Sequence, residues 1–209
     1  LEVSIEQLQS ANVEGVSVTG AGNVLVSASD PQLLADNSVL VKVNLSGGSL
    51  TFDLPSDDND TLVLSSGSII DLNGGTLIID DGTVDARDAT LSEGAINGVV
   101  LNSKLLITAD QLATIGGSVT TDGTGQIEII ADDSDDIATI VANKDALTDS
   151  DLTVVITATT KEAKEALEVA DFTGATQPIS VLVDGVTADN VLNFDEITSD
   201  VTISGTVLG

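Results

Sequence analysis

The sequence predicts a mainly β protein, an elongated, β-solenoid-like repeat domain with a few short helices packed on a parallel sheet. Three observations lead to this prediction. The apolar residues are almost all aliphatic, short strands follow one another closely in the first half, and strands alternate with helices in the second half. Together these features favour thin, repeated layers over a single compact core.

The composition predicts an aliphatic core. The chain is 42% hydrophobic and 19% charged, which is too apolar for a disordered chain. Its only aromatic residues are Phe52, Phe172 and Phe194, so Val, Ile, Leu and Ala must fill the interior. Small and β-branched side chains stack well in repetitive layers. We therefore expect an elongated β body.

The segment 46–89 predicts a series of very short strands. After an acidic loop at residues 56–60, apolar runs and turn residues alternate about every seven or eight positions. This spacing is too short for helices, and it suits either the rungs of a β-solenoid or a meander. The expected strands are Leu50–Leu54, Thr61–Leu64, Ser68–Leu72, Thr76–Asp80 and Thr83–Ala86.

The second half predicts alternating strands and helices. Strand centres at Ile129, Val155 and Val181 lie 26 residues apart, a period typical of solenoid repeats. This order implies parallel strands with helices on one side. The expected strands are Gln126–Ala131, Leu152–Ala158 and Ile179–Val183, and the expected helices are Asp135–Leu147 and Lys161–Ala170, the second with a capping box of Thr159 and Glu162.

An internal echo predicts two loosely related halves. The run Ser4–Leu8 returns in altered form at Thr108–Leu112, about 104 positions later. We therefore expect a β-rich repeat half at residues 1–105 and a strand-helix repeat half at residues 106–184. Residues 185–209 form a third segment. Because the chain contains no methionine, we also expect Leu1 to lie downstream of the start of translation.

The charge excludes several partners. The chain has 34 acidic and six basic residues and a net charge of −28, which repels nucleic acid and anionic membranes. No apolar run approaches the roughly 18 residues of a membrane-spanning helix, so we expect no membrane insertion. The acidic residues also repel one another in the folded state. We therefore expect bound cations, and Ca²⁺ suits carboxylate and carbonyl oxygens.

The residue types predict that the chain is not an enzyme. It has no His, Cys or Tyr, and its only cationic residues are Arg87 and five lysines. The usual general bases and activated nucleophiles are therefore missing. Paired carboxylates alone could hydrolyse glycosides, but sugar sites generally also use aromatic platforms. We expect Arg87 to pair with a neighbouring carboxylate.

The C-terminal stretch combines an acidic hinge with an alternating strand pattern from Val201 to Val207. Such a strand needs a partner in the preceding chain, in a further module or in another molecule. The stretch resembles the opening of the bacterial Ig-like repeats of giant RTX, type I-secreted surface adhesins, and it departs from them at Phe194-Asp195. The residues that carry the resemblance are Val186–Asn193, Glu196 and Val201–Val207.

The resemblance implies an extracellular location, a first Ig-like strand at residues 185–209 and calcium at the module junction. The implied calcium ligands are Asp184, Asp189, Asn193, Asp195 and Glu196, of which Asp189, Asn193 and Glu196 match the motif. They lack the spacing of an EF-hand.

Two acidic clusters are weaker calcium candidates. One contains Asp57, Asp58 and Asp60, and the other contains Asp132 and Asp133. A solvated turn is the alternative for both clusters. Acids beside the expected helix at residue 135 also favour the helix dipole, which is a structural role.

The sequence therefore predicts a non-catalytic, calcium-stiffened structural or adhesive segment of a large extracellular bacterial repeat protein, such as a surface or biofilm adhesin. We expect it to be secreted or held at the bacterial cell surface. Its partners would be neighbouring Ig-like modules of the same polypeptide or identical subunits. One alternative is a self-assembling S-layer or filament subunit that uses the C-terminal strand for strand addition. Another is a carbohydrate- or surface-binding module, which the scarcity of aromatics disfavours.

Overall fold

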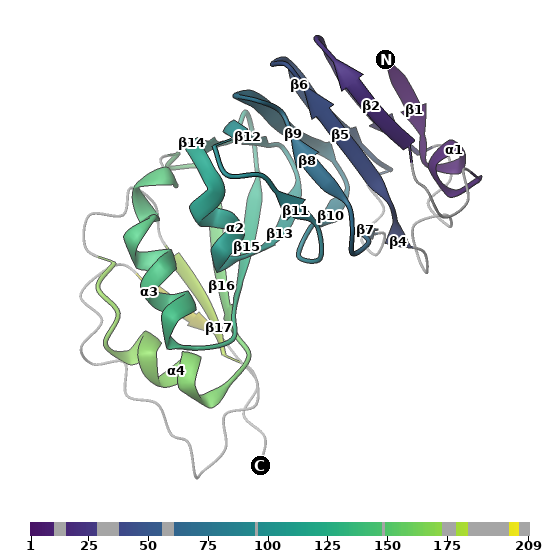
Figure 1. Cartoon of the computed structure of the whole chain (residues 1–209). Helices are drawn as coiled ribbons and strands as arrows, with labels where there is room; N and C mark the ends of the chain where they lie inside the picture. The colour runs from purple at the N-terminus through teal and green to yellow at the C-terminus, as the bar shows by residue number, and fades with distance from the viewer. Residues whose placement is uncertain are drawn as a thin grey trace.

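The computed structural model describes residues 1–10, 16–28, 38–55, 61–94, 96–147, 149–172, 179–183 and 201–204. These residues form three parallel sheets and a few short helices, so the prediction of a mainly β fold with parallel strands is confirmed. The strands stack into a long body with β1 near one end and β17 near the other (Figure 1).

We name the three sheets A, B and C. Sheet A contains β1 Glu2–Ser4, β3 Val24–Ser27, β6 Ser49–Asp53, β9 Gly75–Asp81, β12 Ile96–Leu101 and β14 Ile115–Thr120. Sheet B contains β2 Val16–Gly20, β5 Val41–Leu45, β8 Ile69–Asp71 and β11 Thr90–Leu91. Sheet C contains β4 Ser38–Val39, β7 Thr61–Leu64, β10 Thr83–Asp85, β13 Lys104–Thr108, β15 Gln126–Ala131, β16 Thr153–Ala158, β17 Ile179–Val183 and β18 Val201–Ser204.

The chain visits the sheets in a repeating order, A then C then B. One such circuit is a coil, and each strand pairs in parallel with the strand one coil further along. After β11 the position of sheet B is taken by helices α2 Ala109–Thr114, α3 Ser134–Ala142 and α4 Lys161–Glu168, which continue its row in Figure 1. Helix α1, Ile5–Ser10, occupies the sheet C position before β4. Sheet C then continues from β4 to β18, the largest number of strands in the three sheets of the described residues.

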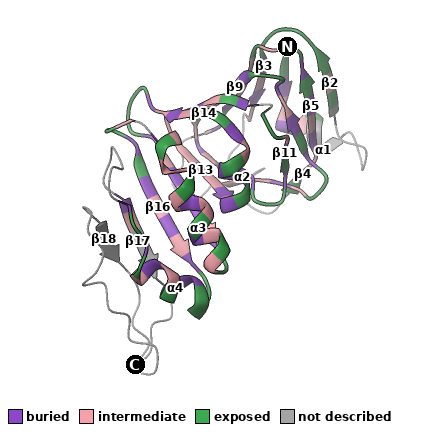
Figure 2. Cartoon of the chain, turned by 60° about the vertical axis from the view of Figure 1, so that its left-hand side comes forward, coloured by how far each residue is buried: buried purple, intermediate pink, exposed green. Residues whose placement is uncertain are grey.

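The interior consists of aliphatic ladders. In sheet A, Leu50, Leu77, Val99 and Val119 lie opposite one another on successive strands, and each side chain is at most 1% exposed. Burial alternates along the strands, as Figure 2 shows for β16. Each coil therefore buries its apolar residues against the next coil, which agrees with the short, closely spaced strands of the sequence.

The strands expected in the first half are confirmed, but the meander alternative is wrong. Successive strands such as β7, β8 and β9 belong to different sheets, so they do not pair with one another. Each pairs in parallel with a strand of the next coil, for example β7 with β10. The close spacing along the sequence reflects three strands per coil.

The second half needs three corrections. The helix expected at Asp135–Leu147 ends at Ala142, where Asn143 leaves helical geometry, and a short 3-10 turn, η2 Lys144–Ala146, follows. The helix expected at Lys161–Ala170 ends at Glu168, and its N-cap is Thr160, not Thr159. The three strands are confirmed.

The third correction concerns register. Ile129 lies opposite Ile156, not Val155, and Ile156 lies opposite Val181. The period is therefore not uniform, and the one-residue difference decides which side chains face the core.

The strand expected near the C-terminus is present as β18 and pairs in parallel with β17, so its partner lies within the chain. The boundary expected between residues 105 and 106 falls within β13, and sheet C continues across it.

Candidate functional site

Most of the predicted calcium ligands lie outside the described residues. This applies to all five hinge residues and to one of the two further clusters, namely Asp184, Asp189, Asn193, Asp195 and Glu196, and Asp57, Asp58 and Asp60. Their prediction as ligands stays a prediction.

The described pair, Asp132 and Asp133, lies between β15 and α3. The Asp133 carboxylate caps α3 by accepting hydrogen bonds from the backbone N–H groups of Asp135 and Asp136. The Asp132 carboxylate accepts a hydrogen bond from the Thr159 hydroxyl. Both carboxylates thus have local hydrogen-bond partners, and the described part of the chain contains no group of three or more acidic side chains positioned for a metal ion.

The outer face of sheet C carries a cluster of ion pairs, which we call the charged cluster. Arg87 donates to both carboxylate oxygens of Asp85, at 2.8 and 2.6 Å, which confirms the predicted pairing. On the next two strands, Lys104 Nζ lies 2.7 Å from Glu128 Oε2. The hydroxyl of Thr157 donates to the other oxygen of Glu128 at 2.9 Å.

Each carboxylate of the charged cluster is therefore held by a cation. Burial acts to raise the pKa of Asp85, but the hydrogen bonds and charge of Arg87 outweigh it, so that pKa lies below its usual value. The hydrogen bond to Asp85 likewise raises the pKa of Arg87. Glu128 also acts on Arg87 through its charge, so the two ion pairs are neighbours. A carboxylate that stays ionised and paired makes a poor general acid, so the arrangement supports a structural role.

A polar contact that the sequence analysis missed lies where sheet B ends. The buried side chain of Gln111, in the first turn of α2, donates to the carbonyl oxygens of Ala86 and Ala89 at 2.6 and 2.7 Å. Its Oε1 accepts from the backbone N–H of Thr108, whose hydroxyl accepts from the backbone N–H of Gln111. The sequence feature that could have revealed this contact is the echo of Ser4–Leu8 at Thr108–Leu112. Ser4 and Gln7 form the same reciprocal pair of hydrogen bonds at the start of α1.

The outward side chains of sheet A that precede the strand ends, where Asp53 and Asp80 are exposed, form an uncharged face from β3 to β14. They lie in two rows across the strands, and all are partly exposed. One row contains Ser49, Thr76, Gly98 and Ser118, and the other contains Leu25, Thr51, Ile78, Val100 and Thr120.

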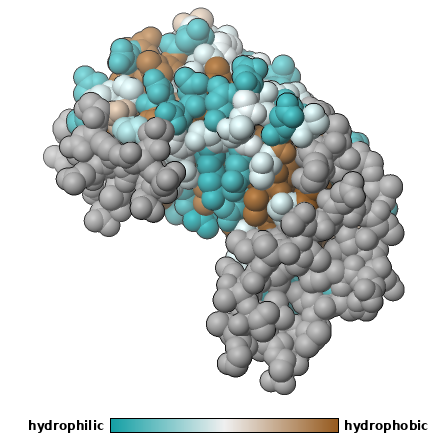
Figure 3. Space-filling view, turned by 180° about the vertical axis from the view of Figure 1, so that it is seen from behind, coloured by the Kyte–Doolittle hydropathy of each residue, from teal (hydrophilic) through white to brown (hydrophobic). Residues whose placement is uncertain are grey.

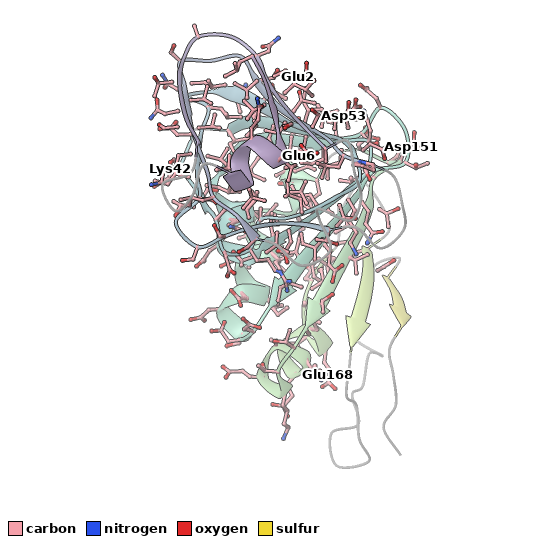
Figure 4. All side chains as sticks on the ribbon, turned by 90° about the vertical axis from the view of Figure 1, so that its right-hand side faces the viewer. Glu2, Glu6, Lys42, Asp53, Asp151 and Glu168 are labelled. Atoms are coloured by element: carbon pink, nitrogen blue, oxygen red, sulfur yellow. The ribbon has the colours of Figure 1, made fainter. Side chains whose placement is uncertain are left out.

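Charged side chains lie on sheet B and at the strand ends of sheet A. Lys42 of β5 and Asp53, at the carboxyl end of β6, lie on opposite sides of the stack (Figure 4). From behind, the described surface shows hydrophobic patches separated by hydrophilic residues (Figure 3). The uncharged face of sheet A is therefore distinct from the charged cluster of sheet C, and each is set by the outward positions of one sheet.

None of the helices in the described residues is long and apolar enough to cross a membrane. The chain matches no family model, no curated protein sequence and no solved structure.

Proposed function

We propose that this chain is a structural and adhesive segment of a large extracellular bacterial repeat protein, such as a surface or biofilm adhesin. In this role it extends and presents neighbouring modules, it performs no catalysis, and calcium stiffens it. The assignment of the coils as a β-solenoid is part of the proposal and is supported by their repeating order of sheets.

The continuity of sheet C is the observation that carries the proposal. Its eight strands, from β4 to β18, pair in parallel without a break while helices replace strands on another side. Each coil packs mainly on its neighbours, so added coils lengthen the body without enlarging its cross-section. A body of this kind suits a spacer that holds other modules away from the cell surface.

Residues 185–209 are proposed as an acidic hinge and the start of an Ig-like module. This part of the proposal rests on the resemblance of their sequence alone, because β18, which lies within these residues, pairs in parallel with β17 as the edge strand of sheet C. Calcium at this hinge would offset part of the net charge of −28 and restrain the junction.

Thermal unfolding in calcium and in chelator tests the calcium role. We expect calcium to raise the melting temperature of the chain and of a control in which two exposed acids are neutralised, Asp110→Asn with Asp145→Asn. We expect it to have little effect on Asp189→Asn with Glu196→Gln, which carries the same charge change. Identical melting curves of the parent chain in calcium and in chelator would refute calcium stiffening.

A second candidate is a self-assembling S-layer or filament subunit. It is favoured by the position of β18, which is the edge strand of sheet C and pairs on one side only among the described residues. An edge of this kind can accept a strand from another molecule. Sedimentation distinguishes the two, because ordered polymers support the subunit and an extended monomer supports the adhesin segment.

A further inference from the structure

The uncharged face of sheet A stands out in a chain with a net charge of −28. Across five successive strands, from β3 to β14, its two outward rows contain hydroxyl and aliphatic side chains, one glycine and no ionisable side chain. Exposed acids border the rows, with Asp53, Asp80 and Asp122 at the carboxyl ends of the strands and Glu2 on β1, where it lies opposite Leu25. An uncharged face in so acidic a chain suits an occupant without charge, because the face offers no ion-pair partner.

The hydroxyl groups of this face restrict the occupant further. Those of Ser49, Thr51, Thr76 and Ser118 make no hydrogen bond with the part of the chain that the structure describes. Covering them with a dry apolar surface would leave them without partners, at a cost of roughly 1–3 kcal/mol each. The occupant must therefore offer donors and acceptors of its own, which disfavours the face of a second copy packed without water.

The two rows follow the spacing of the strands. Parallel strands place the members of each row about 4.8 Å apart, and alternate residues along a strand about 6.6 Å apart. Tetrahedral water with O–H···O distances of about 2.75 Å places second-neighbour oxygens about 4.5 Å apart. Hydroxyl groups on β6, β9 and β14, with Gly98 and the methyl groups of Val100 between them on β12, follow nearly this spacing and can thus hold water in an ice-like arrangement across several strands.

We propose that the outer face of sheet A adsorbs to ice. Its hydroxyls would join the outermost water lattice, and the methyl groups of Thr51, Thr76 and Thr120 would lie between the water molecules, together with Ile78 and Val100. A neutral polysaccharide fits less well, because the described rows contain no aromatic ring on which a sugar could stack. The inference goes beyond the proposed function and holds independently of calcium or of any Ig-like module.

The test measures how much of the full-length chain enters a slowly growing shell of polycrystalline ice, against an inert protein of similar size. The variant Thr76→Lys places a charged side chain on the face. Thr83→Lys is the matched control, because Thr83 is a partly exposed, outward threonine of sheet C. A second matched pair is Thr51→Lys on β6 and Thr61→Lys on β7. Thermal melting of every variant verifies that it folds.

We expect the parent chain and both sheet C variants to be enriched in ice, and both sheet A variants to fall to the level of the inert protein. Exclusion of the parent chain from ice would overturn the proposal, as would an equal loss in the sheet C controls. Two further measurements test the other occupants. Binding to insoluble cellulose that is lost in Thr76→Lys, or a dimer that the same change dissociates, would assign the face to a polysaccharide or to a second copy.

Discussion

The side-chain amide of Gln111 donates to the carbonyl oxygen of Ala89 at 2.7 Å and takes the place of a backbone N–H. One coil earlier, the corresponding carbonyl accepts from a strand N–H. There, the backbone N–H of Thr90 donates to the carbonyl oxygen of Ser68, and Thr90 follows Ala89 in the chain. Because α2 replaces the next strand of sheet B, no strand N–H among the described residues reaches the carbonyl of Ala89. The Gln111 side chain supplies the missing donor and lets the sheet end against a helix.

Gln111→Leu is expected to destabilise the chain by roughly 1–3 kcal/mol, because it leaves the buried carbonyl of Ala89 without this donor, whereas the carbonyl of Ala86 keeps the backbone N–H of Ala89. Gln111→Glu should cost more at neutral pH, since it places a carboxylate against the same oxygens. Asp110→Ala, at the neighbouring exposed position, should change the free energy of unfolding by less than about 0.5 kcal/mol. Urea unfolding measures all three, and equal stability of the Leu and Ala variants would contradict the role of Gln111.

Gly48→Ala is expected to be far more destabilising than Gly47→Ala. Both glycines have positive φ, 96° for Gly47 and 98° for Gly48, so alanine strains the backbone at either position by about 1–2 kcal/mol. A Cβ on Gly48 would also lie 2.2 Å from the carbonyl oxygen of Gly22 on the preceding coil, whereas a Cβ on Gly47 would meet nothing within 4 Å. The difference in melting temperature between the two variants therefore reports the close contact between coils. Similar melting temperatures would show that the coils can move apart at this corner.

The sequence predicts strands better than it predicts their partners. Alternation places β7, β15 and β17 at their observed bounds, because the pattern is local. It leaves open whether neighbouring strands pair, since pairing depends on residues a whole coil away. The predicted uniform period of 26 residues was wrong by one residue at β16 for the same reason, because the two coils that meet there differ in length.

The contacts of the candidate site also differ in how well the sequence predicts them. The ion pair of Arg87 and Asp85 was predictable because its residues are two positions apart. The role of Gln111 was not, because the carbonyls it binds belong to the preceding coil and come close only in the folded chain. The sequence left two interpretations for Asp133, a calcium ligand or an acid that favours the start of a helix. The structure shows Asp133 as the cap of α3.

Asp149 is expected to make the stability of the chain depend on pH. Its carboxylate accepts hydrogen bonds from the backbone N–H groups of Thr121 and Asp151, and these lower its pKa. The folded chain therefore binds this proton less readily than the unfolded chain does. The stabilisation is fully present above the unfolded pKa of about 3.9, and it is lost as the pH falls through the lower folded value.

The variants Asp149→Asn and Asp151→Asn remove the same charge, so a comparison between them cancels the general effect of lowering the net charge. We expect Asp149→Asn to be the less stable of the two at pH 7 and the difference to shrink as the pH falls below about 4. Urea unfolding at a series of pH values measures this difference. A difference that stays constant over the whole range would show that ionisation of Asp149 does not contribute.

Leu167→Asp tests whether the helices are packed on the strands as an integral part of the stack. Leu167 in α4 is fully buried, and an aspartate there would place an unpaired carboxylate in the apolar core, at a cost of roughly 4 kcal/mol or more. Val169 follows two residues later and is 71% exposed, so Val169→Asp should leave stability nearly unchanged. We expect the first variant to melt at a much lower temperature, with loss of helical circular dichroism, and the second to melt like the parent chain. If both variants melted like the parent chain, α4 would not be packed on sheet C, and the body on which the proposed function rests would lack its helical side next to β16.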